Sequence, residues 1–516
     1  MSSDPVRSLL QKRQEVYEGG GPARIATQHE AGKLTARERL ALLFDPDTFQ
    51  ELNLFVQHRS NDPSLAGKHL PGDGVVTGLG GVDGRVAYVA SQDFTVAGGS
   101  VGEGTARKIR EVMDAALKTG CPFVFINDGA GARIQEGVDA LSGYGDIFFR
   151  NVLLSGVVPQ ISIIAGPCAG GAAYSPALTD FIIQVRNEGQ IYITGPKVIK
   201  EVTGEEISAE ALGGVESHAY YSGVVHFVAE SDEHAVEITK RLLSFLPSNN
   251  AELCPFFPEL AEDAVAPDPM LEQIVPVDPR QPYDVRNVIT HVVDRGDFLE
   301  IQEHFAPNIV IGLGRIQGHT VGVVGNQPIV KAGVLDIDCS DKASRFIRFC
   351  NAFSIPILTF VDVPGFLPGV RQEYGGIVRH GAKMLFAYAA ATVPKITILL
   401  RKAYGGAYLA MCAKSMGADR TAAWPNAEIA VMGPEGAVNV LHRKQIQGAE
   451  DPAAERKRLV EEYTETYANP YLAAERGMID NVILPAETRP YVAAAFSVLR
   501  TKREIRPQKK HGLIPL

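Results

Sequence analysis

The sequence predicts an α/β protein that is built from two copies of one domain in tandem. Patterns of buried β-strands alternate with amphipathic helix patterns along the chain, which is typical of α/β folds. The second half also repeats the first, because Gly78-Leu79-Gly80 aligns with Gly312-Leu313-Gly314 and the alignment continues without a gap. At 516 residues the chain exceeds the length at which single hydrophobic cores stop growing, so at least two domains are expected.

The repeat extends over positions of several chemical types. The aligned positions are Val89, Val96, Gly99, Lys108, Pro122, Asp128 and Gly131 in the first copy, and Val323, Val330, Gly333, Lys342, Pro356, Asp362 and Gly365 in the second. The pair Gly170-Gly171 aligns with Gly405-Gly406 after one inserted residue, and Gly195-Pro196 aligns with Gly433-Pro434 after a few more. We therefore place the two domains at residues 1–265 and 266–516, with the proline-rich segment 255–279 as the linker.

Two short helices are predicted ahead of the first copy. Residues 9–17 and 35–44 both carry apolar side chains at helical spacing. The second helix opens on Thr35 with Glu38 three positions later, which is the pattern of a capping box.

The same order of elements is predicted within each copy. A β-branched run, residues 86–90 or 320–324, precedes a glycine-containing loop and an amphipathic helix. The apolar runs at residues 123–126 and 357–361 then indicate strands that are covered on both faces. After a second helical stretch, one more buried strand leads directly into the paired glycines.

The glycine pairs suggest a chemistry for the turns. The strands at residues 161–165 and 396–400 run into Gly-Gly before a helix-forming stretch, which leaves backbone N–H groups unpaired where the helix dipole favours negative charge. That arrangement outlines an oxyanion hole, in which one donor contributes about 3 kcal/mol to a transition state. The alternative is that each glycine pair only permits a tight strand-to-helix connection.

Five long motifs in this chain resemble the acyl-CoA carboxylase β-subunit family. They are Gly129-Ala130-Gly131-Ala132-Arg133-Ile134-Gln135-Glu136-Gly137, Gly166-Pro167-Cys168-Ala169-Gly170-Gly171-Ala172, Val363-Pro364-Gly365-Phe366-Leu367-Pro368-Gly369, Gln372-Glu373-Tyr374-Gly375-Gly376 and Arg401-Lys402-Ala403-Tyr404-Gly405-Gly406-Ala407-Tyr408. The similarity runs from about Arg7 to Leu516. On these motifs the chain is identified as a carboxyltransferase subunit of that family.

This resemblance implies the fold, the reaction and the partners. It implies two tandem crotonase-like domains, and a hexamer in which the N-domain of one chain faces the C-domain of a neighbour. The implied reaction transfers a carboxyl group from carboxybiotin to the α-carbon of propionyl-CoA, which gives methylmalonyl-CoA. Biotin would be carried by a separate biotin carboxylase and biotin carrier subunit, the CoA thioester would be the substrate, and no metal would be needed in this subunit.

The resemblance also implies roles for the residues of the turns. Backbone amides would hold the thioester oxygen in the first copy and the ureido oxygen of biotin in the second, without an essential histidine or carboxylate base. These amides belong to Gly170, Gly171 and Ala172, and to Gly405, Gly406 and Ala407. Contacts with CoA or biotin are implied for Arg133, Gln135, Tyr174, Gly195, Gly365, Phe366, Tyr404, Tyr408 and Leu409.

Three of these positions leave alternatives open. Arg133 and Gln135 follow a strand end, where they could bind CoA phosphates or belong to an ordinary surface loop. Leu409 stands where propionyl-CoA carboxylases commonly have aspartate, so a methylmalonyl-CoA:pyruvate transcarboxylase or a methylmalonyl-CoA decarboxylase subunit is the alternative.

Composition and charge argue against several other functions. The net charge of −10 gives no attraction to nucleic acid or to an anionic membrane surface. The apolar stretch at residues 157–178 is interrupted by prolines, so no membrane insertion is expected. The six cysteines form no C-x-x-C pair, which favours a reducing, cytoplasmic setting without disulfides or a zinc ribbon.

Two hypotheses from other classes compete with the carboxyltransferase. Gly98-Gly99-Ser100-Val101-Gly102 satisfies the nucleophile-elbow pattern, and a serine hydrolase would need His218 or His226 beside Ser100. The aligned segment 332–336 has no serine, however. A silent scaffold would predict degraded glycine loops, and both loops are intact.

A basic run at residues 500–510 is either a solvated surface or a docking site for a partner.

Overall fold

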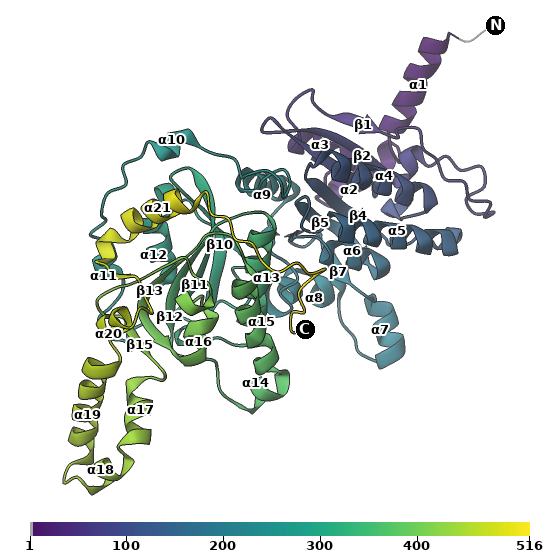
Figure 1. The fold of residues 1–516 in the computed structure, drawn as a ribbon. Coiled ribbons are helices and arrows are strands. Elements are labelled where there is room, and N and C mark those ends of the chain that lie inside the picture. Colours follow the sequence, from purple (N-terminus) through teal and green to yellow (C-terminus); the bar gives the residue numbers. More distant parts are fainter. Residues whose placement is uncertain (1–3) are drawn as a thin grey trace. The chain divides into compact units, whose positions relative to one another are not determined.

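A computed structural model describes residues 4–516 and separates the chain into two compact units, Met1–Leu253 and Cys254–Leu516 (Figure 1). Each unit contains one eight-stranded sheet with helices packed on it. The two sheets have the same strand order, which confirms the α/β class and the internal repeat. The proline-rich segment 255–279 lies in the second unit and contains the short helices α10 (Pro258–Ala261) and α11 (Leu271–Ile274).

From residue 4 onward, three helices precede the first sheet: α1 (Pro5–Tyr17), α2 (Pro22–Glu30) and α3 (Ala36–Leu43). Helix α1 begins earlier than predicted because the Asp4 side chain caps it and Pro5 suits the first helical position. Helix α3 begins after the predicted capping box, in which Thr35 and Glu38 exchange hydrogen bonds. Both predicted N-terminal helices are therefore present.

The sheet of the first unit has the order β1-β2-β3-β4-β5-β6-β8, and β7 pairs with β5 beyond the point where β6 ends. Strands β1 to β3 are antiparallel and the others are parallel. The strands are β1 (Gln50–Leu52), β2 (Val75–Val82), β3 (Arg85–Gln92), β4 (Phe123–Gly129), β5 (Gln160–Ala169), β6 (Phe181–Val185), β7 (Gln190–Tyr192) and β8 (Phe227–Ala229). The later helices are α4 (Glu103–Thr119), α5 (Val138–Leu154), α6 (Tyr174–Ala177), α7 (Pro196–Thr203), α8 (Ala209–Gly213) and α9 (Asp232–Phe245).

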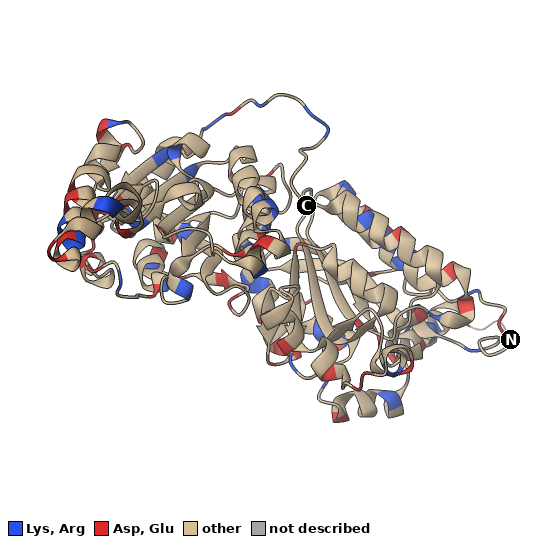
Figure 2. Ribbon diagram, turned by 90° about the horizontal axis from the view of Figure 1, so that it is seen from below, with Lys and Arg blue, Asp and Glu red and all other residues tan. Residues whose placement is uncertain are grey.

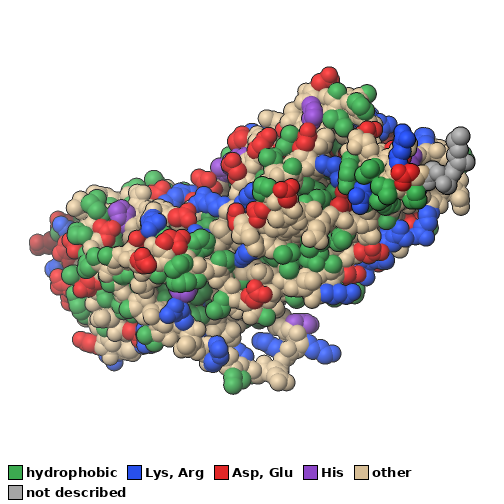
Figure 3. Space-filling view, turned by 90° about the horizontal axis from the view of Figure 1, so that it is seen from above, with side chains coloured by type: hydrophobic (Ala, Val, Ile, Leu, Met, Phe, Trp, Pro, Cys, Tyr) green, Lys and Arg blue, Asp and Glu red, His purple; other side chains and the backbone are tan. Residues whose placement is uncertain are grey.

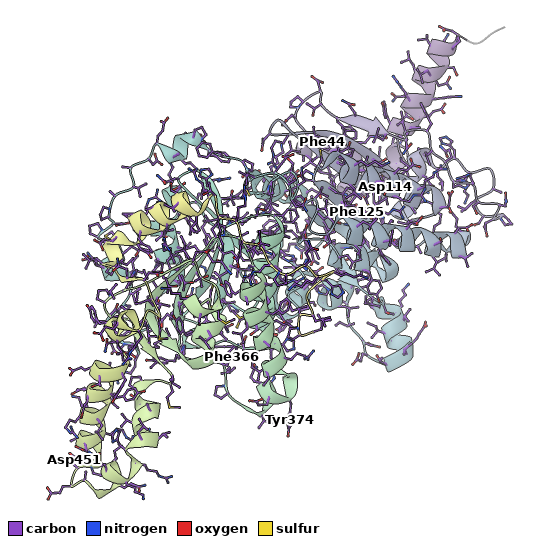
Figure 4. The ribbon with its side chains drawn as sticks, viewed as in Figure 1. Phe44, Asp114, Phe125, Phe366, Tyr374 and Asp451 are labelled. Carbon is purple, nitrogen blue, oxygen red and sulfur yellow. The ribbon has the colours of Figure 1, made fainter. Side chains whose placement is uncertain are left out.

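The second sheet repeats this plan with the order β9-β10-β11-β12-β13-β14-β16, and β15 pairs with β13. Its strands are β9 (Leu299–Ile301), β10 (Ile309–Ile316), β11 (His319–Asn326), β12 (Ile357–Val363), β13 (Lys395–Tyr404), β14 (Arg420–Ala423), β15 (Glu428–Ala430) and β16 (Asn481–Val482). Its helices are α12 (Val285–Val292), α13 (Ile337–Ala352), α14 (Val370–Gly375), α15 (Ile377–Ala390), α16 (Gly405–Ala410), α17 (Pro434–Leu441), α18 (Arg443–Gly448), α19 (Pro452–Tyr467), α20 (Pro470–Glu475) and α21 (Thr488–Leu499). Helices α17 to α19 extend away from the sheet, and Asp451 marks the turn before α19 (Figure 4).

The central strands β4 and β12 form the middle of each core. Every residue of both strands is buried, as their continuous apolar runs predicted. Phe125 of β4 is labelled in Figure 4 within the first sheet. The apolar stretch 157–178 spans β5 and the turn after it, and none of the helices in residues 4–516 is long and apolar enough to cross a membrane.

A buried lysine occupies the same place in both copies. The Lys108 ammonium donates to the carbonyl oxygens of Gly72 and Val75 at 2.9 and 2.5 Å. The Lys342 ammonium donates to the carbonyl oxygens of Gln302, Phe305 and Ile309 at 2.9, 2.7 and 2.8 Å. Burial lowers the pKa of Lys108 to about 8 and that of Lys342 to about 7. Each lysine thus ties the turn before the first hairpin of its sheet to the helix that follows the hairpin.

Candidate functional site

The glycine pairs form the same sharp turn at the end of the longest strand in each sheet. Strand β5 ends at Ala169 and strand β13 ends at Tyr404. The next residues, Gly170 and Gly405, have φ angles of +62° and +57°, a left-handed conformation that favours glycine. A helical turn begins at once in both copies, as Gly170–Ala173 and as α16.

Each turn places backbone amides at the start of a short helical segment. These segments are Gly170–Ala173 and α16. The first N–H groups of a helix have no acceptor within the helix. Open space surrounds Gly406, because a Cβ atom added there would meet no heavy atom within 4 Å. At Gly171 the added Cβ would lie 3.5 Å from the Tyr144 ring. Each turn therefore presents N–H donors where negative charge is favoured.

The loop after the central strand approaches the same turn in the first unit. Gly131 has a φ angle of +87°, and a Cβ atom there would lie 3.0 Å from the carbonyl oxygen of Ala169. The loop is held by pairing of Val101 with Ala132, and the second unit repeats this with Leu335 and Phe366. Four of the five motifs that carried the resemblance thus lie at the carboxyl ends of β4, β5, β12 and β13, and the fifth, residues 372–376, lies at the end of α14.

A buried charge network lies behind the first turn. Asp128, at the end of β4, is paired with Lys33 at 2.6 Å and with Arg39 at 2.9 Å. Arg39 also pairs with Asp232 at 2.8 Å. Glu188 adds a third carboxylate next to these two cations, and its Oε2 atom is buried without a hydrogen-bond partner. Burial, together with the charges of Asp232 and Asp128, raises the pKa of Glu188 from its ordinary value of 4.5 to about 7, against the opposing effect of Arg39 and Lys33.

Glu188→Gln is expected to stabilise the protein at pH 8 and to have less effect at pH 5. A carboxyl group whose pKa is raised in the folded state lowers stability as it ionises, here between about pH 4.5 and 7. Glutamine carries no such charge, so the variant should melt about 2–4 °C higher than the wild type at pH 8. Thermal unfolding of both proteins at the two pH values measures the difference. A constant difference at both pH values would show that Glu188 does not titrate in this range.

The structure places Arg133 inside the first unit rather than at an open surface. Its guanidinium pairs with Asp73 at 2.6 Å and with Glu136 at 2.8 Å, and its side chain is only 2% exposed. These contacts occupy the guanidinium with buried protein partners, and they do not fit the alternative of an ordinary surface loop. Gln135, two positions later, is exposed.

Three other predicted contact residues lie on different elements. Tyr174 follows the first turn and is 50% exposed, with its ring edge-on to Phe148. Gly195 precedes the first residue of α7. Phe366 follows Gly365 in the loop after β12, and its ring lies 2.8 Å from a Cβ atom added at Gly381 (Figure 4).

The residues around the second turn divide into buried and exposed positions. The Tyr404 hydroxyl donates to Glu428 of β15, and the ring is buried. Tyr408 is buried, and its hydroxyl has no hydrogen-bond partner in the part of the chain that the structure describes. Leu409 is 38% exposed on α16. Tyr144, which packs on Gly171, was missed by the sequence analysis because the contact joins α5 to a turn far along the chain.

Ser100 is not arranged as a nucleophile. Its hydroxyl donates to the carbonyl oxygen of Ala97 at 2.8 Å and accepts from Arg133 at 3.2 Å. Of the two histidines that a hydrolase would use, His218 bonds the carbonyl oxygen of Ile191 and His226 accepts from the amide of Ile182. The hydrolase hypothesis therefore has no support.

Charged side chains of both signs lie on the face that Figure 3 shows. Figure 3 shows acidic, basic and apolar side chains interspersed over the face drawn. The basic segment after α21 runs to the C-terminal label in Figure 2. Within it, Lys502 is partnered by Asp419 at 2.8 Å and by Glu504 at 3.1 Å.

Comparisons with known proteins give one consistent result. A family model described as carboxyl transferase domain matches residues 27–514. The chain is 56% identical over 516 residues to the methylmalonyl-CoA decarboxylase subunit alpha of Propionigenium modestum, covering 100% of both chains. It is 55% identical over 513 residues to the propionyl-CoA carboxylase, carboxyltransferase subunit, of Haloferax mediterranei, covering 99% of both. A crystal structure of transcarboxylase 12S, described as a hexamer with methylmalonyl-CoA and methylmalonic acid bound, matches with a TM-score of 0.97 at 55% identity, over 100% of this chain and 99% of that one.

Proposed function

Since the chain belongs to the carboxyl transferase domain family, we propose that it is the carboxyltransferase subunit of a biotin-dependent acyl-CoA carboxylase, and that it forms methylmalonyl-CoA from propionyl-CoA. The observation that carries this proposal is the pair of matching turns at Gly170 and Gly405, each with backbone N–H groups at the start of a helical turn. A carboxyl transfer between two enolates needs two such sites, because each enolate places negative charge on one oxygen.

The two turns take different oxygens in this proposal. The amides of residues 170–172 hold the thioester oxygen of the acyl-CoA, and the amides of residues 405–407 hold the ureido oxygen of biotin. The absence of a side chain at Gly406, with open space around it, fits a bulky ring system. When bound, carboxybiotin supplies the carboxyl group that is transferred. The chain itself supplies N–H donors that are already oriented and so require little reorganisation during the reaction.

The proposed substrate and assembly rest on the relatives. Those described above are named for methylmalonyl-CoA or propionyl-CoA, and the same half-reaction serves a carboxylase, a transcarboxylase or a decarboxylase. We assign the carboxylase direction first and keep the other two as alternatives. A homohexamer, a biotin carboxylase and biotin carrier partner, and a reducing cytoplasmic setting complete the proposal; the six cysteines are free thiols.

The half-reaction can be tested with the purified chain in reverse. Methylmalonyl-CoA and free biotin are mixed with the protein, and propionyl-CoA is quantified by chromatography. We expect propionyl-CoA formation that depends on biotin and is faster than the corresponding reaction of malonyl-CoA. Light scattering should give six times the chain mass of 55.6 kDa.

Release of free CoA thiol separates the competing classes. A hydrolase would release thiol without biotin, whereas the carboxyltransferase should leave the thioester intact. An intact hexamer that converts neither methylmalonyl-CoA nor malonyl-CoA in the presence of biotin would contradict the proposal and return the scaffold hypothesis.

A further inference from the structure

Both glycine turns are preceded by the same irregularity in the sheet. In the first unit, Asn127 of β4 pairs with Ile164 of β5, but Gly129 pairs with Cys168. The second unit has the same shift, because Val361 pairs with Leu399 while Val363 pairs with Ala403. One residue of the central strand therefore spans a bulge of the next strand, and that residue is an aspartate in both copies, Asp128 or Asp362.

In the second unit the aspartate holds the bulge directly. Asp362 is 1% exposed, and its carboxylate accepts from the backbone amide of Lys402 at 3.1 Å and from the guanidinium of Arg401 at 3.0 Å. Both donors belong to the bulge. Only Ala403 and Tyr404 separate Lys402 from Gly405.

In the first unit the same carboxylate binds cations from another segment. Gly166 stands where the second unit has Arg401, and a Cβ atom there would lie 1.9 Å from Asp128 Oδ1 and 2.8 Å from Lys33 Nζ. The glycine thus leaves room for Lys33 and Arg39. Arg39 completes the connection, because it pairs with Asp128 and donates to the bulge carbonyl of Ala165 at 3.1 Å.

A second repeated contact fixes the aspartates themselves. The Gln92 side chain accepts from the amide of Asp128 at 3.1 Å and donates to the carbonyl oxygen of Gly99 at 2.9 Å. In the second unit, Asn326 accepts from the amide of Asp362 at 3.2 Å and donates to Gly333 at 3.2 Å. The backbone of each aspartate is therefore held by a side chain of the preceding strand, β3 or β11. Its carboxylate contacts the bulge of β13 directly, or the bulge of β5 through Arg39.

We propose that Asp128 and Asp362 are positioning residues that set where β5 and β13 end, and so where the amides of the two glycine turns lie. This inference rests on the proposed function of the turns. Beyond the bulge, Cys168 pairs with Ile191 and Ala403 pairs with Ile429, so a change in the bulge moves the last strand residues against β7 or β15. A displacement of about 1 Å in a catalytic group can cost about 10²-fold in rate.

Substitution of the two aspartates should change the KM values of different substrates. Asp362→Asn is expected to lower kcat and to raise the KM for free biotin about tenfold in biotin-dependent decarboxylation of methylmalonyl-CoA, with the KM for methylmalonyl-CoA unchanged. Asp128→Asn is expected to raise the KM for methylmalonyl-CoA and to leave the KM for free biotin unchanged. Loss of folded protein alone would lower the apparent kcat and move neither KM.

Asp294→Asn is the matched control. Asp294 is also buried in the second unit and accepts from two backbone amides and from Arg489 at 2.9 Å, but it lies at the hairpin turn Gln317-Gly318. It should change stability without changing either KM. Folded variants of Asp128 and Asp362 that keep both wild-type KM values would overturn the proposal.

Hydrogen exchange gives a second readout that does not need activity. Asp362→Asn should speed exchange of the amides at residues 403–408, measured by mass spectrometry on the full-length protein, while Asp294→Asn should not. If the wild type lacked biotin-dependent activity, the proposed function would fail and this measurement would still decide the structural part. Unchanged exchange at residues 403–408 would refute it.

Discussion

Gly406→Pro is expected to lower kcat for biotin-dependent decarboxylation of methylmalonyl-CoA by about 10²- to 10³-fold, because it deletes one N–H donor of the second turn. Proline is tolerated in the first turn of a helix, and Gly406 is the second residue of α16. The loss should therefore arise from the missing donor rather than from unfolding. Steady-state kinetics, with circular dichroism to confirm folding, measure it.

Gly406→Ala is the control for this substitution. The added methyl group would meet no heavy atom within 4 Å, and Gly406 does not have a positive φ angle. Alanine keeps the N–H donor, so the variant should retain activity within a few-fold if only the backbone amide at this position is needed. Equal losses in Gly406→Ala and Gly406→Pro would instead indicate that the space at Gly406, and not its amide, is required.

Arg39→Met is expected to destabilise the protein by about 3–5 kcal/mol, because it leaves buried carboxylates without their counter-ion. Arg39 is buried and pairs with both Asp128 and Asp232. Burial already raises the pKa of Asp232 in the presence of Arg39. Ionisation of such a group lowers stability as pH rises, so the defect should be smaller at pH 5 than at pH 8. Urea unfolding followed by circular dichroism at both pH values measures this effect.

Arg458→Met provides the comparison for a surface pair. Arg458 of α19 forms ion pairs with Glu455 and Glu462 at the same distance, 2.9 Å, but its side chain is 55% exposed. Water screens such pairs, so no measurable change in stability is expected. A large loss for Arg458→Met, or none for Arg39→Met, would show that burial does not govern the strength of these pairs.

Much of the fold followed from local patterns in the sequence. The Thr35 capping box begins a helix where predicted, and the central strands of both sheets contain the predicted buried runs. The strands into the glycines were predicted too short, at residues 161–165 and 396–400, because Gly166-Pro167 and Arg401-Lys402 interrupt the apolar pattern. Those residues form the bulges, which only pairing with the neighbouring strand can define.

The site was predictable where its chemistry is local and repeated. The Gly-Gly turns follow from residue type and from their recurrence in both copies. Arg133 shows the opposite case, because its partner Asp73 lies far from it in the sequence and no local pattern marks a strand-end arginine as buried. Tyr144 likewise reaches Gly171 only through tertiary packing of α5.

The segments that supply the cations paired with Asp128 and Asp362 determine which fragments of the chain would keep these ion pairs. In the second unit the cation paired with Asp362 is Arg401 of the same sheet, so a fragment that begins at Cys254 contains both partners. In the first unit the cations that serve Asp128 come from Lys33 and Arg39, ahead of the sheet. A fragment that began at β1 would retain every strand of the first sheet and would still lack the charges that neutralise its centre. An expression plasmid for the isolated first unit should therefore start upstream of Gln28, which also donates to Asp128.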